Sequence, residues 1–506
     1  MPTVTAAEPL IACKIGEWAG RRMGTIPALV RSRRYALLAP PGPPPSGWND
    51  HSISRHRRRL EDTILDRKSL APLNELRPID IWRFLRTQPA SYWLICMYLF
   101  LEYVRPQSIY ESIGFLPWAR FCIVFCVVAF LLEGKWPRLR SPATAPLVLY
   151  SAIVLASSAL AYNPTISIQS LSLFFSWVLI YLLITNIVVT ERRFLVFVLS
   201  FLLYNFKMSL HGTRSWAAIG FAFRDWGVTG APGWFENSGE FGIEMTMFFP
   251  MSVCFIVALR RYWSKRKLAL FMLLPVTSAI GMVASSSRGA LLGGVAVLWW
   301  FVLRSRYKVR ALLTVAVIAA AAVAIVPPQQ VGRLKTAGAD PTSLRRLTYW
   351  RDGVRIMNDH PVFGIGYANW GEFYRRYYDP RGQLPHNIFV QAGSELGYAG
   401  LLAFVLLIAY TFVINHRTRK LARRLPSGEF LNGMAHGLDG ALIGYLVSGF
   451  FVTVLYYPYF WINLAMTVAL HRAATNQCVH AVEAVVRQTA SGPAGWTPRT
   501  SLGQKG

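Results

Sequence analysis

Charged residues are scarce in this chain, and acidic ones are scarcest. Of its 506 residues only 15% are charged, whereas 53% are hydrophobic and the mean hydropathy is +0.34. A soluble domain is nearer a quarter charged, so the composition excludes an ordinary soluble enzyme and a disordered chain. We predict an all-α polytopic membrane protein, because an open sheet would leave unpaired backbone groups in lipid.

Several chemical signatures are missing as well. The six cysteines are scattered and form no C-x-x-C pair, so neither a disulfide framework nor a zinc site is indicated. There is no Walker loop and no GxGxxG after a strand, which argues against ATP-driven transport. The long outer loops hold no D-x-D, so we expect no metal at a diphosphate and no cofactor. The negative charge of a phosphate group would then have to be neutralised by arginine side chains.

Basic residues exceed acidic ones by 53 − 25 = 28. Such an excess can indicate nucleic acid, but here the positive charges lie mostly between apolar segments, as in membrane proteins, and we expect no nucleic acid partner. Apolar runs of membrane-spanning length predict about twelve helices: 91–104, 115–132, 145–161, 169–189, 194–210, 240–259, 268–285, 289–303, 311–327, 397–415, 437–455 and 458–472.

Every even-numbered helix is followed by a short basic loop, which places these loops and both termini in the cytoplasm. The loops 211–239 and 328–396 are long and lie on the opposite face, the periplasmic one if the membrane is a bacterial inner membrane. We divide the chain into a basic tail (1–88), N-terminal membrane helices (89–144), a membrane core (145–472) and a C-terminal tail (473–506). The first tail is read as largely disordered. It either lies on anionic lipid or is an extension from an upstream start codon.

Two arginine-bearing segments face the outer side. Ser287-Arg288-Gly289 joins two predicted helices, and the Arg288 guanidinium there could either bind a phosphate bidentately or snorkel at a helix end. A helix predicted at 341–357 has an apolar face of Leu344, Leu347, Val354 and Met357, beside which Arg351 and Arg355 converge with Arg345 and Arg346. The alternative is an amphipathic helix bound to lipid head groups.

Histidines supply the candidate proton carriers. His386 stands at the mouth of a span and could accept or donate a proton, with Asn387 orienting it, or it could be a structural histidine. Glu395 is expected to lie too deep to touch it. His360 and His211 are competitors, and His360 could serve a turn. Lys207, His211 and Arg214 would share one helix face and could contact a diphosphate, or simply be charges at a helix end.

Together these motifs resemble the O-antigen ligase and polymerase superfamily. The resemblance rests on Ser287-Arg288-Gly289, on Trp350-Arg351-Asp352 ahead of Asp359-His360-Pro361, and on His386-Asn387 followed after nine residues by Gly397-x-x-Gly400. It covers roughly 145–472. The stretches Glu102 to Gln107 and Lys207 to Trp216 look like the branch described as O-glycosylation ligases associated with exosortase systems. Residues 1–88 depart from the family.

The resemblance implies a glycosyltransferase that uses an undecaprenyl-diphosphate-linked glycan and an acceptor glycolipid, glycan or protein. By the same resemblance, Arg288 and Arg351 bind the diphosphate, and His386 acts on the acceptor hydroxyl or assists departure of the diphosphate. The His-Asn spacing favours a ligase over a polymerase of repeat units. A flippase is less favoured, because the polar residues gather at the outer edge rather than at the membrane midplane.

Overall fold

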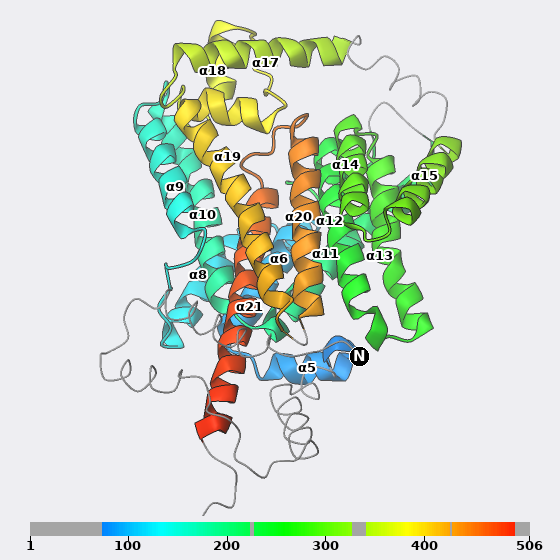
Figure 1. Ribbon diagram of the computed structural model, residues 1–506. Helices are drawn as coiled ribbons and strands as arrows, with labels where there is room; N and C mark the ends of the chain where they lie inside the picture. Colours follow the sequence, from blue (N-terminus) through cyan, green and yellow to red (C-terminus); the bar gives the residue numbers. More distant parts are fainter. Residues whose placement is uncertain (1–72, 223–226, 326–340, 426–427, 491–506) are drawn as a thin grey trace, which may run out of the picture. The chain divides into compact units, whose positions relative to one another are not determined.

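The computed structural model describes residues 73–222, 227–325, 341–425 and 428–490. The chain divides into two compact units, one of residues 71–475 and one of residues 1–70 with 476–506. The larger unit is helical, and no strand occurs among its described residues (Figure 1). The all-α prediction is therefore confirmed for this part of the chain.

The first half of the described chain supplies four short helices and a series of longer apolar ones. Their bounds are α5 Pro78–Arg86, α6 Ala90–Tyr103, α7 Pro106–Ile109, η1 Glu111–Ile113, α8 Trp118–Leu132, α9 Thr144–Ala159, α10 Pro164–Ile187, α11 Glu191–Ala218, α12 Ser238–Leu259 and η2 Arg260–Tyr262.

The second half consists of apolar helices with two consecutive charged helices between them. The bounds are α13 Lys265–Ala284, α14 Arg288–Arg304, α15 Lys308–Ile325, α17 Pro341–Asp359, α18 Trp370–Tyr377, α19 Ile388–Ala422, α20 Glu429–Gly449 and α21 Pro458–Ala490. Each of the twelve predicted segments coincides with one apolar helix, from α6 to α21.

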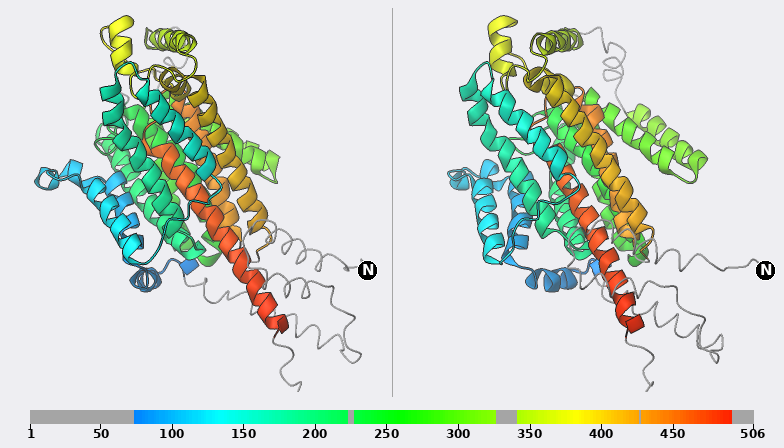
Figure 2. Two further views of the ribbon diagram at one scale, coloured as in Figure 1. Left: turned by 90° about the vertical axis from the view of Figure 1, so that its left-hand side faces the viewer. Right: turned by 60° about the vertical axis from the view of Figure 1, so that its left-hand side comes forward.

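The apolar helices pack side by side as a bundle. Helix α12 contacts α13, α14 and α20, and α19 contacts α9 and α20. Helix α17 packs on α19 and lies across one end of the bundle, as the views of Figures 1 and 2 both show. The bundle thus presents α17 and α18 at the end where α12, α14 and α19 begin.

Five of the helices are long and apolar enough to cross a membrane: Pro164–Ile187, Glu191–Ala218, Ser238–Tyr262, Lys265–Ala284 and Ile388–Ala422. Two shorter apolar helices, α8 and α9, accompany them. The protein is therefore a multi-pass membrane protein, while the count of twelve spans stays a prediction.

Several predicted bounds were wrong, and the differences bear on the site. Helix α11 continues to Ala218, so residues 211–218 are helix rather than loop. Helix α19 begins at Ile388 instead of 397, because Asn387 caps it, and Gly397 (φ 70°) is a kink inside it. Helix α20 ends at Gly449, so 450–457, which was predicted partly as span, is a connection between helices.

The predicted tails are only partly irregular. Helix α5 occupies Pro78–Arg86 within the segment read as disordered, and α21 continues beyond 472 to Ala490. The rest of the predicted N-terminal tail, 1–72, lies outside the described residues.

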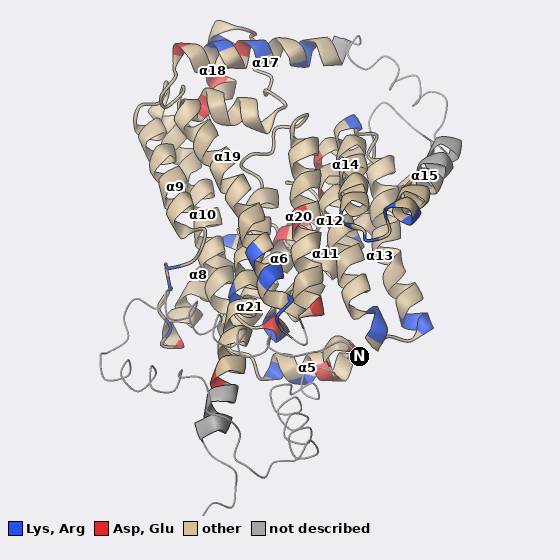
Figure 3. Ribbon diagram, viewed as in Figure 1, with Lys and Arg blue, Asp and Glu red and all other residues tan. Residues whose placement is uncertain are grey.

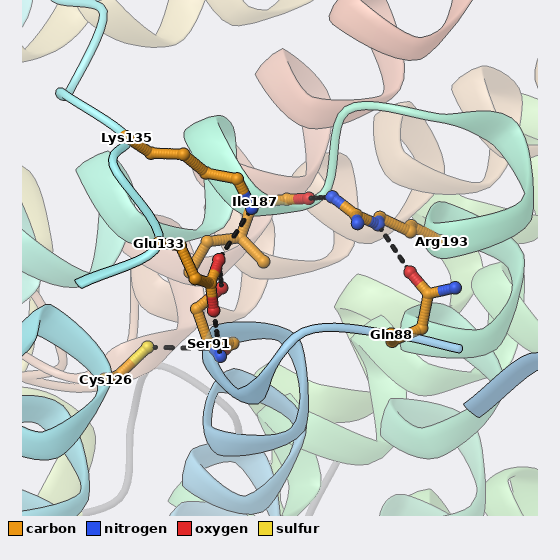
Figure 4. A network of polar contacts seen from close by, with 7 residues as sticks. All are labelled: Gln88, Ser91, Cys126, Glu133, Lys135, Ile187 and Arg193. Atoms are coloured by element: carbon orange, nitrogen blue, oxygen red, sulfur yellow. Dashed lines mark hydrogen bonds and ion pairs between the residues drawn. The ribbon is translucent and has the colours of Figure 1, made fainter. Parts of the chain in front are cut away.

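A polar network ties α6, α8 and α11 together at the end of the bundle opposite α17 (Figure 4). The Glu133 carboxylate accepts hydrogen bonds from Ser91 N (2.9 Å) and Ser91 Oγ (2.8 Å) and pairs with Lys135 Nζ at 2.6 Å. Nearby, Arg193 Nε donates to Gln88 Oε1 at 2.7 Å. A carboxylate at the first turn of α6 also opposes the positive end of that helix, so Glu133 fixes where α6 begins.

Charged residues lie mainly near the helix ends in Figure 3, as expected for membrane helices. If α17 lies outside the cytoplasm, a cysteine at exposed Thr348 should react with a membrane-impermeant maleimide in intact spheroplasts, and one at exposed Ser264, before α13, should not. Cys96, Cys122, Cys126 and Cys254 are buried, which limits background labelling. Labelling of the cysteine at position 264 with protection of the one at position 348 would show that α17 lies on the cytoplasmic side.

Candidate active site

Three helix N-termini meet around the connection 450–453. Helix α12 follows the Asn237 cap, α14 follows the Ser287 cap and α19 follows the Asn387 cap. A Cβ added at Gly239 would lie 3.4 Å from Val452 Cγ2 and 4.0 Å from Ser287 Oγ. On the other side, His386 N donates to Thr453 Oγ1 at 2.8 Å. Converging helix N-termini make a region favourable to an anion.

Arg288 is the first residue of α14 and stands at this convergence. The turn before it is tight, with Ser286 in the left-handed region (φ 53°) and Ser287 Oγ accepting from Ala290 N at 3.3 Å. The half-buried Arg288 side chain reaches α17, where Nη1 contacts Ser343 Oγ at 3.5 Å. Arg288 therefore extends from the start of α14 toward α17.

The next residue, Gly289, lets the 450–453 connection approach α14. A Cβ at Gly289 would lie 3.1 Å from Phe451 Cβ and 3.2 Å from Ser448 O. Phe451 in turn packs on Trp350 of α17, with 6.1 Å between ring centroids. The Ser-Arg-Gly step thus sets both the direction of Arg288 and the close packing that surrounds it.

The backbone at His386 has an unusual conformation, which hydrogen bonds on both sides of the residue hold in place. Its φ is +50°, which is unusual for a residue other than glycine and costs about 1–3 kcal/mol. The preceding carbonyl, Pro385 O, accepts from Trp350 Nε1 at 3.1 Å, and Asn387 Oδ1 accepts from Phe389 N (2.8 Å) and Val390 N (3.1 Å). Asn387 therefore acts as a helix cap that fixes the backbone after His386, rather than as a partner of its imidazole.

The imidazole of His386 lies beside Tyr349 and Arg346 of α17. The Tyr349 and His386 ring centroids are 6.4 Å apart. Burial and the neighbouring Arg346 guanidinium lower the pKa of His386 from its ordinary 6.5 to about 4. The side chain is therefore neutral at physiological pH, and the neutral form is the one that can accept a proton.

Arg346, rather than Arg351, is the α17 arginine at His386. Five helical positions separate Arg346 from Arg351, which turns them about 140° apart, and Arg351 is exposed. Of the apolar face predicted from the sequence, Leu344, Leu347 and Val354 are exposed and Met357 is buried. The face that packs is instead rotated by roughly a third of a turn and holds Tyr349, Asp352, Gly353, Ile356 and Met357.

Gly353 and Tyr374 explain this rotation. A Cβ at Gly353 would overlap Val390 of α19, so only glycine allows α17 to approach so closely. Tyr374 of α18 packs edge-on against Tyr349 at 5.6 Å and donates to Asp352 Oδ2 at 2.8 Å. Asp352 also pairs with Arg355 (3.4 Å). Arg355 is thus paired with Asp352, and the convergence of Arg351 and Arg355, both exposed on α17, stays a prediction.

Glu395 is buried and serves the connection before α18. Its carboxylate accepts from Trp370 N at 3.1 Å and from the Tyr456 hydroxyl, and its carbonyl accepts from Gly366 N at 3.0 Å and Ser157 Oγ at 2.8 Å. None of these bonds involves His386, in agreement with the expectation. Glu395 holds the outer segment on the bundle.

His360 lies in a turn, as one interpretation of the sequence held. It follows α17, its carbonyl accepts from Gly364 N at 3.1 Å, and its exposed ring packs against Phe373. Tyr349, beside His386, stands ten positions before the end of α17 at Asp359, or about 15 Å along the helix. The structure therefore separates His360 from His386.

Lys207, His211 and Arg214 share one exposed face of α11, because the helix continues through them beyond its predicted end at 210. In the described part of the chain, no hydrogen bond or ion pair joins them to His386. Within the same ranges, no three His, Cys, Asp or Glu side chains are placed to hold a metal ion. The residues that the structure does gather are Arg288, Arg346, His386 and the three helix caps.

Known proteins match this part of the chain. Residues 274–405, which include Arg288, Arg346 and His386, match the family model described as O-antigen ligase. The resemblance to the O-antigen ligase superfamily is confirmed. An O-antigen ligase of Pseudomonas aeruginosa is 32% identical over 163 residues, which make up 31% of this chain and 38% of that protein. The match spans well under half of that relative's length, and the exosortase-associated branch stays a prediction.

Proposed function

We propose that this protein is a membrane glycosyltransferase that moves a glycan from undecaprenyl diphosphate to an acceptor hydroxyl. In this proposal the reaction takes place at the periplasmic face of the bacterial inner membrane. The observation that carries the proposal is the placement of Arg288, Arg346 and His386 around three helix N-termini. That arrangement combines groups for an anionic leaving group with a neutral base, on the region that matches the O-antigen ligase family.

The reaction follows from this chemistry. The acceptor oxygen attacks the anomeric carbon of the donor, and the bond from that carbon to the diphosphate oxygen breaks. The diphosphate keeps the electron pair of that bond, and its growing negative charge is stabilised by the fixed guanidinium groups and helix N-termini. The proton of the acceptor hydroxyl passes to His386.

Arg346 would link binding of the diphosphate to the proton affinity of His386. In the free protein its charge disfavours a proton on His386. A diphosphate bound between Arg288 and Arg346 would offset that charge, and the proton affinity of His386 would rise. The base therefore becomes stronger when the donor is in place.

Arg346→Gln and Arg351→Gln form a matched pair for this assignment. Arg346→Gln should lower transfer by about 10²-fold, because it removes a charge that faces the leaving group. Arg351→Gln, on the exposed side of α17, should retain most activity. The measurement is initial rate with purified, equally folded variants. A larger loss of activity in Arg351→Gln than in Arg346→Gln would assign the diphosphate site to Arg351, as the family resemblance implied.

A polymerase that joins lipid-linked repeat units is the second candidate, because the same donor chemistry serves both reactions. Deletion of the gene separates them. Accumulation of long glycans on undecaprenyl diphosphate indicates a ligase block, and accumulation of single units indicates a polymerase block. A flippase would leave neither pattern on the outer face.

A further inference from the structure

Helix α18 and the residues after it expose aromatic rings. Trp370, Tyr374 and Tyr378 stack in parallel, with ring centroids 5.0 and 5.1 Å apart and planes within 9° and 5°. Trp370 and Tyr374 are buried, but Tyr378 is 37% exposed and its neighbour Tyr377 is 59% exposed. Tyr377 extends the surface to Tyr162, which is 41% exposed and 5.7 Å away between centroids.

Two of the arginines beside these rings, Arg375 and Arg381, are paired with carboxylates. Arg375 lies 3.7 Å from Glu372, and Arg381 forms a bidentate pair with Asp379, with Nη2 to Oδ2 at 2.8 Å. The surface therefore offers aromatic faces and hydrogen-bonding groups, and the exposed Arg376 adds a positive charge beside Tyr162. Sugar rings match this chemistry, because their C–H faces pack on aromatic rings and their hydroxyls bond to carboxylates and guanidinium groups. An anionic lipid surface would match unpaired basic residues instead.

The aromatic surface lies on the far side of His386 from Arg288. Along α17, Arg288 contacts Ser343, His386 lies beside Tyr349, and Tyr374 bonds to Asp352. Ser343 and Asp352 are nine positions apart, or about 13 Å along the helix. A glycan bound at the α18 surface would therefore approach His386 from the side opposite the diphosphate.

We infer that Tyr162, Tyr377 and Tyr378, with Arg381 and Asp379, bind the glycan of the acceptor. This inference rests on the proposed function for the identity of the two substrates. The site holds acceptor sugars beyond the one that carries the reacting hydroxyl, and it orients the acceptor chain toward His386. It takes no part in the chemical step.

The test is the double variant Tyr377→Ala/Tyr378→Ala, with exposed Tyr110→Ala as the matched control. Purified full-length protein in nanodiscs is assayed with lipid-linked donor and with glycolipid acceptor from the bacterium that encodes it. The KM for the acceptor should rise about three- to tenfold, as expected for lost aromatic contacts. The kcat and the KM for the donor should stay unchanged, and Tyr110→Ala should resemble the parent protein.

Binding of the acceptor glycan is also measured in the absence of catalytic turnover. Oligosaccharide released from the same glycolipid by mild acid should give saturation-transfer NMR signals with the parent protein that weaken in the double variant. Those signals test the surface even if the parent transfers no glycan, an outcome that would sink the proposed function alone. An unchanged acceptor KM with unchanged signals overturns the inference. A rise in the donor KM alone overturns it as well, and assigns the surface to the donor glycan.

Discussion

Arg288→Lys should lose glycan transfer almost as completely as Arg288→Ala, by about 10²–10³-fold. Lysine keeps the charge but not the planar fork that binds two phosphate oxygens. It also cannot reproduce the reach to Ser343 with the geometry of a guanidinium. The measurement is kcat/KM for the lipid-linked donor on purified variants of equal thermal stability.

The control for this variant is Arg120→Lys, an exposed arginine just inside α8. It should remain active, because a charge at a helix end is served by either residue. Should Arg288→Lys keep parental transfer at equal protein level, Arg288 is a membrane anchor and the diphosphate site lies elsewhere.

His386→Ala should lower transfer by about 10²–10⁴-fold, the usual contribution of a general base. Donor binding should persist, because the arginines and helix N-termini supply it. His386→Gln tests the structural alternative, since glutamine keeps hydrogen bonding without accepting a proton near neutral pH. Full activity in His386→Gln would remove the base from the mechanism, and loss of donor binding in His386→Ala would move this residue to the phosphate site.

The pH dependence follows from the same residue. The pKa of His386 is lowered to about 4, so the base is in its active, neutral form at all higher pH. The value of kcat/KM should therefore be flat from about pH 6 to 8 and fall as the pH drops through about 4. Removing the Arg346 charge raises the pKa of His386, so Arg346→Gln should shift this fall toward higher pH.

Hydropathy was enough to locate the apolar helices, because their signal is local. The helix predicted at 341–357 also followed from a local pattern, and α17 spans Pro341–Asp359, whereas the grouping of Arg288 with a loop arginine came from the family resemblance. The rotation of α17 did not, since it is decided by Gly353 against Val390 and by Tyr349 against Tyr374. These partners lie on other elements, so the helical periodicity of α17 alone indicated its more aliphatic face, and the choice of Arg351 came from the family resemblance.

Hydropathy also could not identify residues 450–457 as a connection between helices. Phe450, Phe451 and Val452 are as apolar as a span, so the sequence placed them in a helix. Thr453 and Tyr456 within it bond to His386 N and the Glu395 carboxylate, contacts that span more than sixty positions of the chain. The residues that hold the site together are thus distant in sequence, whereas those proposed to do the chemistry stand in short motifs.

Reconstituted transfer tests the central claim most directly. The purified full chain is placed in lipid vesicles with undecaprenyl-diphosphate-linked glycan and glycolipid acceptor, and both the glycosylated acceptor and free undecaprenyl diphosphate are quantified. The account predicts that the two products appear in equal amounts, and that both fall together in His386→Ala and Arg288→Lys. Lengthened glycans still attached to undecaprenyl diphosphate, or movement of the donor across the vesicle membrane with no acceptor modified, would contradict it.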